Sequence, residues 1–184
     1  MRYFFGFLFI ILLVVVTFVL VLHGFRGNKT TSNIDLPSYA TTSTVMQFTV
    51  DGPITADQIH KGIRITVGQY ANTIQVYQGY QNNVIQSKSY ETNGAAYAAF
   101  LHALQLLNYT SGNKDPKVAD PRGYCPQGER FTFQIISDEG TNVQNYWGTS
   151  CGGQGTFGGN LTAVQSLFEA QIPDYPTIAG SANL

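Results

Sequence analysis

The sequence has few charged side chains and only two cysteines. Asp, Glu, Lys and Arg make up 11% of its 184 residues, and beyond about residue 40 there are seven Lys or Arg against ten Asp or Glu. Nucleic-acid binding needs clustered positive charge, so this weakly acidic balance argues against a nucleic-acid partner. An uncharged polar surface suits an extracellular or envelope setting.

Patterns typical of catalytic and cofactor sites are also scarce. The histidines beyond the N-terminal region, His60 and His102, have no metal-ligand spacing with Cys, Asp or Glu, and no convincing set of Ser, His and an acid is apparent. A glycine-rich stretch at residues 151–160 lacks the G-K-[ST] ending of a phosphate-binding loop. The carboxylates that come closest to a cluster, without matching a calcium-binding loop, are Asp115, Asp120, Asp138 and Glu139. We therefore predict a protein that is not an enzyme and that holds no metal or cofactor.

One long hydrophobic run stands at the N-terminus. Residues 3–22 read YFFGFLFIILLVVVTFVLVL, which is uncharged and long enough for a helix that crosses a bilayer. A cleaved signal peptide is the alternative, but signal peptides usually have an apolar region of about 7–15 residues and a small-residue cleavage site. We predict an uncleaved transmembrane anchor at residues 1–26, with the lipid bilayer as its partner.

The charges beside this run do not decide its orientation, because Arg2 precedes it while Arg26 and Lys29 follow it. The cysteines give the better indication, since stable disulfides belong to oxidising compartments. If Cys125 and Cys151 pair, the chain crosses the cell membrane once and its C-terminal part lies outside the cytoplasm.

Three further segments follow the anchor. Residues 27–43 are rich in Ser, Thr and Asn, and this composition predicts a flexible tether. Residues 44–176 have the hydrophobic pattern of a folded extracytoplasmic domain, and we predict that residues 177–184 form a disordered tail.

Within the domain, period-two patterns precede helical ones. Apolar and polar residues alternate, as in strands with one buried face, at residues 45–50, 63–67, 71–80, 131–135 and 143–147, and more weakly at 83–91. Helical spacing follows Asn93, a suitable N-cap, and returns near Asn160 or Thr162. Short connections favour antiparallel neighbours. We predict an α+β fold in which two amphipathic helices pack on one face of an antiparallel sheet.

The two cysteines flank the last predicted hairpin. A turn centred near Glu139 would place Cys125 and Cys151 side by side at the open end of this hairpin, as a disulfide requires. A redox or catalytic thiol is the alternative, but such thiols usually occur in C-x-x-C or beside a basic partner. We predict a structural disulfide that fixes the ends of the hairpin.

The tyrosines are the residues of this sequence that are most typical of a binding surface, because each combines an aromatic ring with a polar hydroxyl. The aromatic residues of the predicted strands and loops include Tyr70, Tyr77, Tyr80, Tyr90, Tyr124, Tyr146 and Trp147. Tyr77 and Tyr146 are out of phase with apolar neighbours, so we predict that both face away from the core and form a binding face with Tyr80. The alternative is that aromatic residues occur here because they favour strands.

Four stretches behind the anchor carry a family resemblance: AAYAAFLHALQLLNY, GYCPQGERFTFQI, YWGTSC and LFEAQIPDY. Their combination resembles small uncharacterised membrane-anchored proteins of candidate-phylum bacteria. The resemblance spans most of the chain after residue 45. It implies an anchored domain but transfers no activity and no functional residue.

These patterns together predict a membrane-anchored, extracytoplasmic binding or envelope-assembly module, whose partner is another envelope protein or a surface glycan. Three alternatives stay open. The order of helix, hairpin and helix is similar in outline to emfourin-type protease inhibitors. GFLFII is similar to the cleavage junction of type IV pilins, although Ile11 stands where they have glutamate. A hydrolase with an unrecognised site is the third, and a deep pocket that joins His60 or His102 to a carboxylate would favour it.

The predicted location can be tested by mass spectrometry and labelling. Cys125 and Cys151 should be linked in protein taken directly from its cells, because an oxidising compartment preserves the bond. A label at the C-terminus should be accessible from outside the cytoplasm. Two free thiols, or a C-terminus in the cytosol, would contradict the predicted location.

Overall fold

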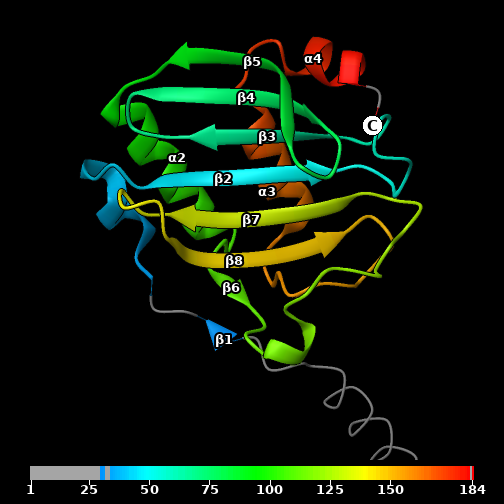
Figure 1. Cartoon of the computed structure of the whole chain (residues 1–184). Coiled ribbons are helices and arrows are strands. Elements are labelled where there is room, and N and C mark those ends of the chain that lie inside the picture. The colour runs from blue at the N-terminus through cyan, green and yellow to red at the C-terminus, as the bar shows by residue number, and fades with distance from the viewer. Residues whose placement is uncertain (1–29, 32–33, 183) are drawn as a thin grey trace, which may run out of the picture.

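The structure, a computed structural model, describes residues 30–31, 34–182 and 184. Its main feature is a six-stranded antiparallel sheet with the order β5-β4-β3-β2-β7-β8 (Figure 1). The strands of this sheet are β2 (Val45–Asp51), β3 (Lys61–Val67), β4 (Ala71–Gln78), β5 (Asn83–Glu91), β7 (Arg130–Ile136) and β8 (Asn142–Thr149). A second, small sheet pairs β1 (Thr30–Thr31) with β6 (Ser111–Gly112). The predicted α+β class with an antiparallel sheet is confirmed.

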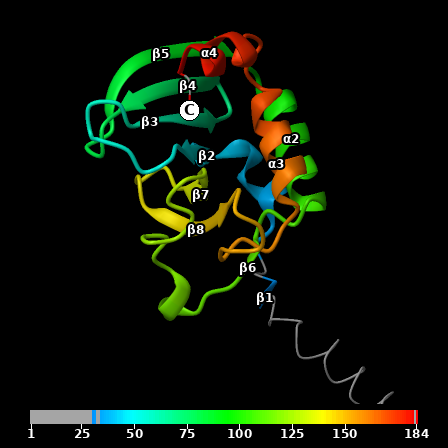
Figure 2. The same ribbon diagram turned by 90° about the vertical axis from the view of Figure 1, so that its right-hand side faces the viewer.

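Helices cover one face of the large sheet. Figure 2 shows α2 (Gly94–Leu106) and α3 (Leu161–Glu169) side by side on the same side of the sheet, with α4 (Tyr175–Ala182) near its β5 end. The side chains of Asn93 and Asn160 cap α2 and α3, since each accepts a hydrogen bond from a backbone N–H of the first turn, at 3.0 and 3.1 Å. No α-helix of the described residues covers the opposite face, which we call the open face.

Aromatic rings pack between the sheet and the helices. Phe48 of β2 lies 5.3 Å from Phe133 of β7 and 5.5 Å from Phe168 of α3, measured between ring centroids, and all three are fully buried. Tyr109 is also fully buried, and its hydroxyl donates to the backbone oxygen of Gln134 at 2.9 Å. Because side chains alternate along a strand, the neighbours of the core residues point to the open face.

The folded domain begins within the segment that the sequence predicts as a tether. The 3-10 helix η1 (Leu36–Thr41) lies against α2, and Leu36 is fully buried. The backbone N–H of Leu36 donates to Oε1 of Gln105 at 3.0 Å. Ile34, Tyr39 and Ala40 also pack against the core. The polar composition of residues 27–43 hides these contacts, because the few apolar residues are dispersed among Ser, Thr and Asn.

The C-terminal segment also differs from its prediction as a disordered tail at residues 177–184. It forms most of α4, in which Ile178 and Ala182 are 4% and 2% exposed and belong to the core. Just before this helix, the carboxylate of Asp174 accepts a hydrogen bond from the hydroxyl of Tyr90 in β5 at 2.6 Å. The short helix has few large apolar residues, so the sequence pattern does not predict it. Its burial depends on packing against the rest of the domain.

The predicted anchor at residues 1–26 lies outside the described residues. In the part of the chain that the structure describes, no helix combines the length and the apolar character needed to span a membrane. The anchor therefore stays a prediction.

The predicted disulfide between Cys125 and Cys151 is confirmed, with 5.6 Å between the two Cα atoms. Pairing of β7 with β8 ends at Arg130 and Thr149, so turns bring the two sulfurs together beyond the strands. In one of these turns the N–H of Gly128 donates to the backbone oxygen of Cys125 at 3.2 Å. The bond links residues 26 positions apart and thereby closes the open end of the hairpin.

Removal of this disulfide should lower the free energy of unfolding by about 3 kcal/mol, because the unfolded chain regains the entropy of an open loop. The test is urea unfolding of the double variant Cys125→Ser, Cys151→Ser. It can be followed by the fluorescence of the single tryptophan, Trp147, which is 4% exposed. Reductant should destabilise the native protein by a similar amount and leave the double variant unchanged. Equal stability of the two proteins would argue against a stabilising bond.

Candidate functional site

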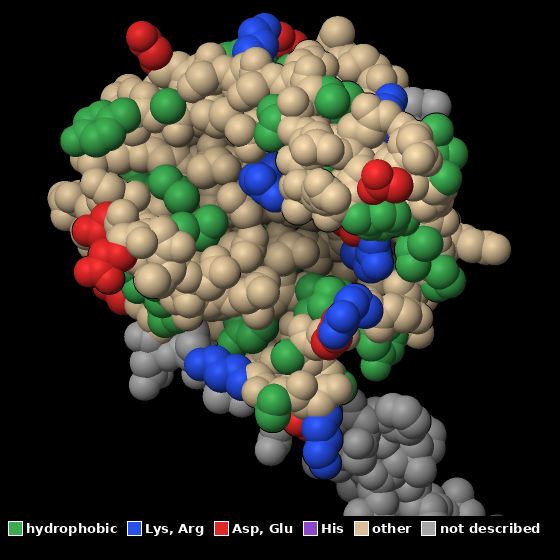
Figure 3. Space-filling model, viewed as in Figure 1, with side chains coloured by type: hydrophobic (Ala, Val, Ile, Leu, Met, Phe, Trp, Pro, Cys, Tyr) green, Lys and Arg blue, Asp and Glu red, His purple; other side chains and the backbone are tan. Residues whose placement is uncertain are grey.

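A hollow of about 280 Å³ lies in the open face of the large sheet. We call it the open-face hollow, and its lining includes Thr49, Asp51, Arg64, Tyr80, Thr132 and Gln134. Figure 3 shows this face, which is recessed near its middle and carries few charged side chains there. In the register of the sheet, one row across the open face contains Gln75, Arg64, Thr49 and Thr132. Within this row, Arg64 therefore has uncharged polar side chains as its neighbours.

The carboxylate of Asp51, at the end of β2, fixes one side of the hollow. Its Oδ1 accepts hydrogen bonds from Nε2 of His60 at 2.8 Å and from the hydroxyl of Tyr77 at 3.2 Å. Its Oδ2 accepts a hydrogen bond from the guanidinium of Arg130 in β7. Hydrogen bonds that involve a charged group are about twice as strong as neutral ones, so Asp51 ties β4 and β7 to the end of β2.

Gly62 makes the contact between Tyr77 and Asp51 possible. It lies between these two residues in the strand register, and the ring of Tyr77 crosses over it. A Cβ atom on Gly62 would come within 2.2 Å of the Tyr77 ring, so any side chain there would displace the ring. Burial, followed by the charge of Asp51, raises the pKa of Tyr77 far above its usual range.

His60 serves this cluster as a hydrogen-bond donor. Its side chain is 1% exposed, and its ring stacks on that of Tyr80 with 4.2 Å between the centroids. Nδ1 lies 3.0 Å from the backbone oxygen of Pro53, and Nε2 faces Asp51. Both partners are acceptors, so the ring makes both hydrogen bonds only when both nitrogens carry a proton. Neither nitrogen is then free to take a proton from a substrate.

Arg64 is the charged group of the hollow without a counterion. It makes no ion pair and no hydrogen bond with any described residue, and its Nε is buried without a partner. Its Cζ lies 5.5 Å from the centroid of the Tyr77 ring, within the range of a cation–π contact. Asp51 makes no ion pair with Arg64 in the described part of the chain, and its oxygens accept from three other donors.

The β8 side of the open face is covered by the loop that precedes β7. Trp147 points to this face beside Thr132, and its Nε1 donates to the backbone oxygen of Val118 at 2.9 Å. The ring of Tyr124 lies 5.0 Å from that of Trp147. The contacts of both aromatic side chains therefore hold the loop on the β8 side of the sheet.

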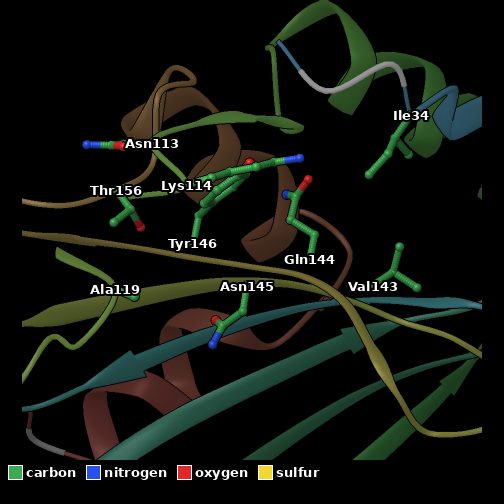
Figure 4. A pocket seen from close by; sticks show the side chains of 9 residues that line it. All are labelled: Ile34, Asn113, Lys114, Ala119, Val143, Gln144, Asn145, Tyr146 and Thr156. Atoms are coloured by element: carbon green, nitrogen blue, oxygen red, sulfur yellow. The ribbon is translucent and has the colours of Figure 1, made fainter. Parts of the chain in front are cut away.

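The three tyrosines of the predicted binding face do not share one site. Tyr77 and Tyr80 both line the open-face hollow, where they are 3% and 48% exposed. Tyr146 instead pairs with a core phenylalanine of β7 and lies on the helix side. Figure 4 shows Tyr146 and Gln144 pointing to one side of β8 and Asn145 to the other, at a second hollow of about 330 Å³. The alternation of residue types along β8 does not show which side chains face away from the core, because residues on both faces of this strand are buried.

Two serine patterns that resemble catalytic motifs do not have the required structural context. Ser150 has the G-x-S-x-G spacing, but a nucleophile elbow needs a strand followed directly by a helix. Ser150 lies in a loop after β8, and its Oγ accepts the N–H of Glu129 at 2.9 Å. Ser111 and Lys114 have the S-x-x-K spacing, but Ser111 lies in a strand and is 5% exposed.

The charged residues of the open-face hollow are not marked by any motif. Asp51 and Arg130 lie 79 positions apart and meet only because β2 pairs with β7. Arg64 has the sequence context of any polar residue in an alternating strand. The one local signal is that Asp51 and His60 stand at the two ends of the connection between β2 and β3.

Neither metal chemistry nor similarity to other proteins identifies the site. Among residues 30–31, 34–182 and 184, no group of three His, Cys, Asp or Glu side chains is placed to hold a metal ion. A scan of the sequence against protein-family models gives no match, and no curated protein matches it. A functional assignment therefore depends on the geometry of the open-face hollow.

The variant Tyr77→Phe should lose less stability at high pH than the native protein. The unfolded chain releases a tyrosine proton near pH 10, whereas the raised pKa keeps folded Tyr77 protonated. The contribution of Tyr77 to the free energy of unfolding is thus complete below about pH 10. It is lost as the pH rises towards the pKa of Tyr77 in the folded protein. In this range the free energy of unfolding should fall by up to about 1.4 kcal/mol per pH unit because of Tyr77.

Urea unfolding between about pH 9 and about pH 11 measures this slope. The native protein and the control Tyr70→Phe, in which the altered ring is 74% exposed, should show the steeper loss. Identical slopes for all three proteins would be inconsistent with a buried, uncharged Tyr77 beside Asp51.

Proposed function

We propose that this chain is a non-catalytic binding or assembly module of the cell envelope. An N-terminal anchor would hold it at the membrane, with the α+β domain outside the cytoplasm. The disulfide between Cys125 and Cys151 supports this location, because such bonds persist in oxidising compartments. The partner is another envelope protein or a surface glycan, bound at the open face.

The unpaired Arg64 in the open-face hollow is the observation that carries the proposal. Charged side chains that are largely covered are normally paired, because an unpaired charge is costly to remove from water. Arg64 is half-buried and has no such partner among the described residues. A concave surface with a few polar groups in fixed positions is typical of a ligand site.

The same geometry favours binding over hydrolysis. The hollow does join His60 to a carboxylate, which is the arrangement that a hydrolase would need. A catalytic base, however, must reach the substrate and have a nitrogen that accepts a proton. His60 lies beneath Tyr80, and acceptor atoms occupy both of its nitrogens, so the pair acts as a structural clamp.

Photo-crosslinking in native membranes tests the proposed binding face. A photo-reactive residue in place of Gln75, which lies beside Arg64 on the open face, should capture the partner. The control places the same residue at Ser166, an exposed position of α3 on the helix side. Capture from position 75 alone supports binding at the open face. No capture from position 75, or equal capture from both positions, would reject it.

A further inference from the structure

We propose that the open-face hollow binds an acidic glycan, with the carboxylate of one sugar unit on the guanidinium of Arg64. This inference rests on the proposed function and names the class of ligand for the same site. Three features of the hollow support it: its charge, its polar floor and its aromatic surface.

The charge of the hollow favours an anion. Arg130 forms an ion pair with Asp51, and His60 lies at hydrogen-bond distance from the same carboxylate, so the one carboxylate among the described lining residues already has a counterion. Arg64 remains as a cation whose buried Nε has no acceptor in the described part of the chain. A carboxylate would supply the missing negative charge, since it binds the planar guanidinium through charge-assisted hydrogen bonds.

The floor of the hollow favours a sugar over a peptide. Thr49 and Thr132 are paired across β2 and β7, while the amide of Gln134, nearby, is bonded to Gln47 and Asn142. The threonine hydroxyls can both donate and accept hydrogen bonds, as sugar hydroxyls do. An extended peptide would instead add to a free strand edge. The strands under the hollow, β2, β3 and β7, are each paired on both sides.

Tyr80 provides a fixed aromatic surface at the same hollow. One face of its ring stacks on His60, and its hydroxyl donates to the backbone oxygen of Thr55 at 2.8 Å. The side chain is nevertheless 48% exposed, so part of the ring is open to a ligand. The C–H face of a sugar ring is apolar and packs against such a surface. Arg64 and Tyr80 can therefore bind the carboxylate and the ring of one sugar unit.

Calorimetric titration of the full chain in detergent with tetragalacturonate tests the inference. Arg64→Gln should weaken binding about 10- to 100-fold, because it removes a charge-assisted pair of hydrogen bonds. The affinity of Arg64→Lys should lie between those of the native protein and Arg64→Gln, since lysine keeps the positive charge but lacks the planar guanidinium group. The fully methyl-esterified tetramer, which has the same sugars without the charge, should bind the native protein about as weakly as the acid binds Arg64→Gln.

Lys114→Gln is the matched control. It removes an exposed cation from the second hollow and should leave the affinity unchanged. Arg64 makes no ion pair and no hydrogen bond within the described fold, so Arg64→Gln should retain the fluorescence of the native protein and an unfolding midpoint close to it. A loss of affinity in Lys114→Gln with none in Arg64→Gln would move the site to the second hollow and overturn the inference.

The remaining outcomes separate the ligand class from the proposed function. Equal binding of acid and ester, or no binding of tetragalacturonate, rejects an acidic glycan. Equal binding of tetraglutamate rejects the preference for a sugar. If crosslinking from position 75 captures a partner while tetragalacturonate does not bind, the binding module survives and only its ligand class is wrong. Failure of that capture would reject the binding module independently of any sugar titration.

Discussion

The carboxylate of Asp51 accepts three hydrogen bonds, and the arrangement of the open face follows from them. One donor is His60, whose ring supports Tyr80. Another is Tyr77, whose ring lies beside the guanidinium of Arg64. A single carboxylate thus positions Tyr80, through His60, and the Tyr77 ring beside Arg64. The charge of this carboxylate is balanced by Arg130. Without the Arg130 counterion, the negative charge of Asp51 would offset the positive charge of Arg64 in the same hollow.

Stability and binding are assigned to opposite faces of the same strands. Phe48 packs against Phe133 and the helices, while its neighbour Thr49 lines the open-face hollow. Ile63 and Arg64 divide in the same way in β3. Alternation along a strand makes this division automatic, and the aliphatic and aromatic side chains on the helix side form the buried core. The open face can therefore carry polar groups in an arrangement that would be costly inside a core.

Local patterns predict much of the fold and little of the site. The strands follow from alternation, the caps of α2 and α3 from Asn93 and Asn160, and the disulfide from the position of the two cysteines around a hairpin. Each of these depends on residues that are close in sequence. Leu36 in η1 and Ile178 in α4 are held by distant partners, and a short polar or alanine-rich segment gives no local sign of that burial. The pairing of β2 with β7 is equally remote, so the meeting of Asp51 with Arg130 could not be predicted.

A crystal structure of the chain with bound galacturonate would test the central claim most directly. We expect the sugar carboxylate within hydrogen-bond distance of Arg64 and its ring against Tyr80, with Asp51 still bonded to His60, Tyr77 and Arg130. An Asp51 carboxylate turned towards Arg64, or a sugar found only in the second hollow at the edge of the sheet, would be the contrary result.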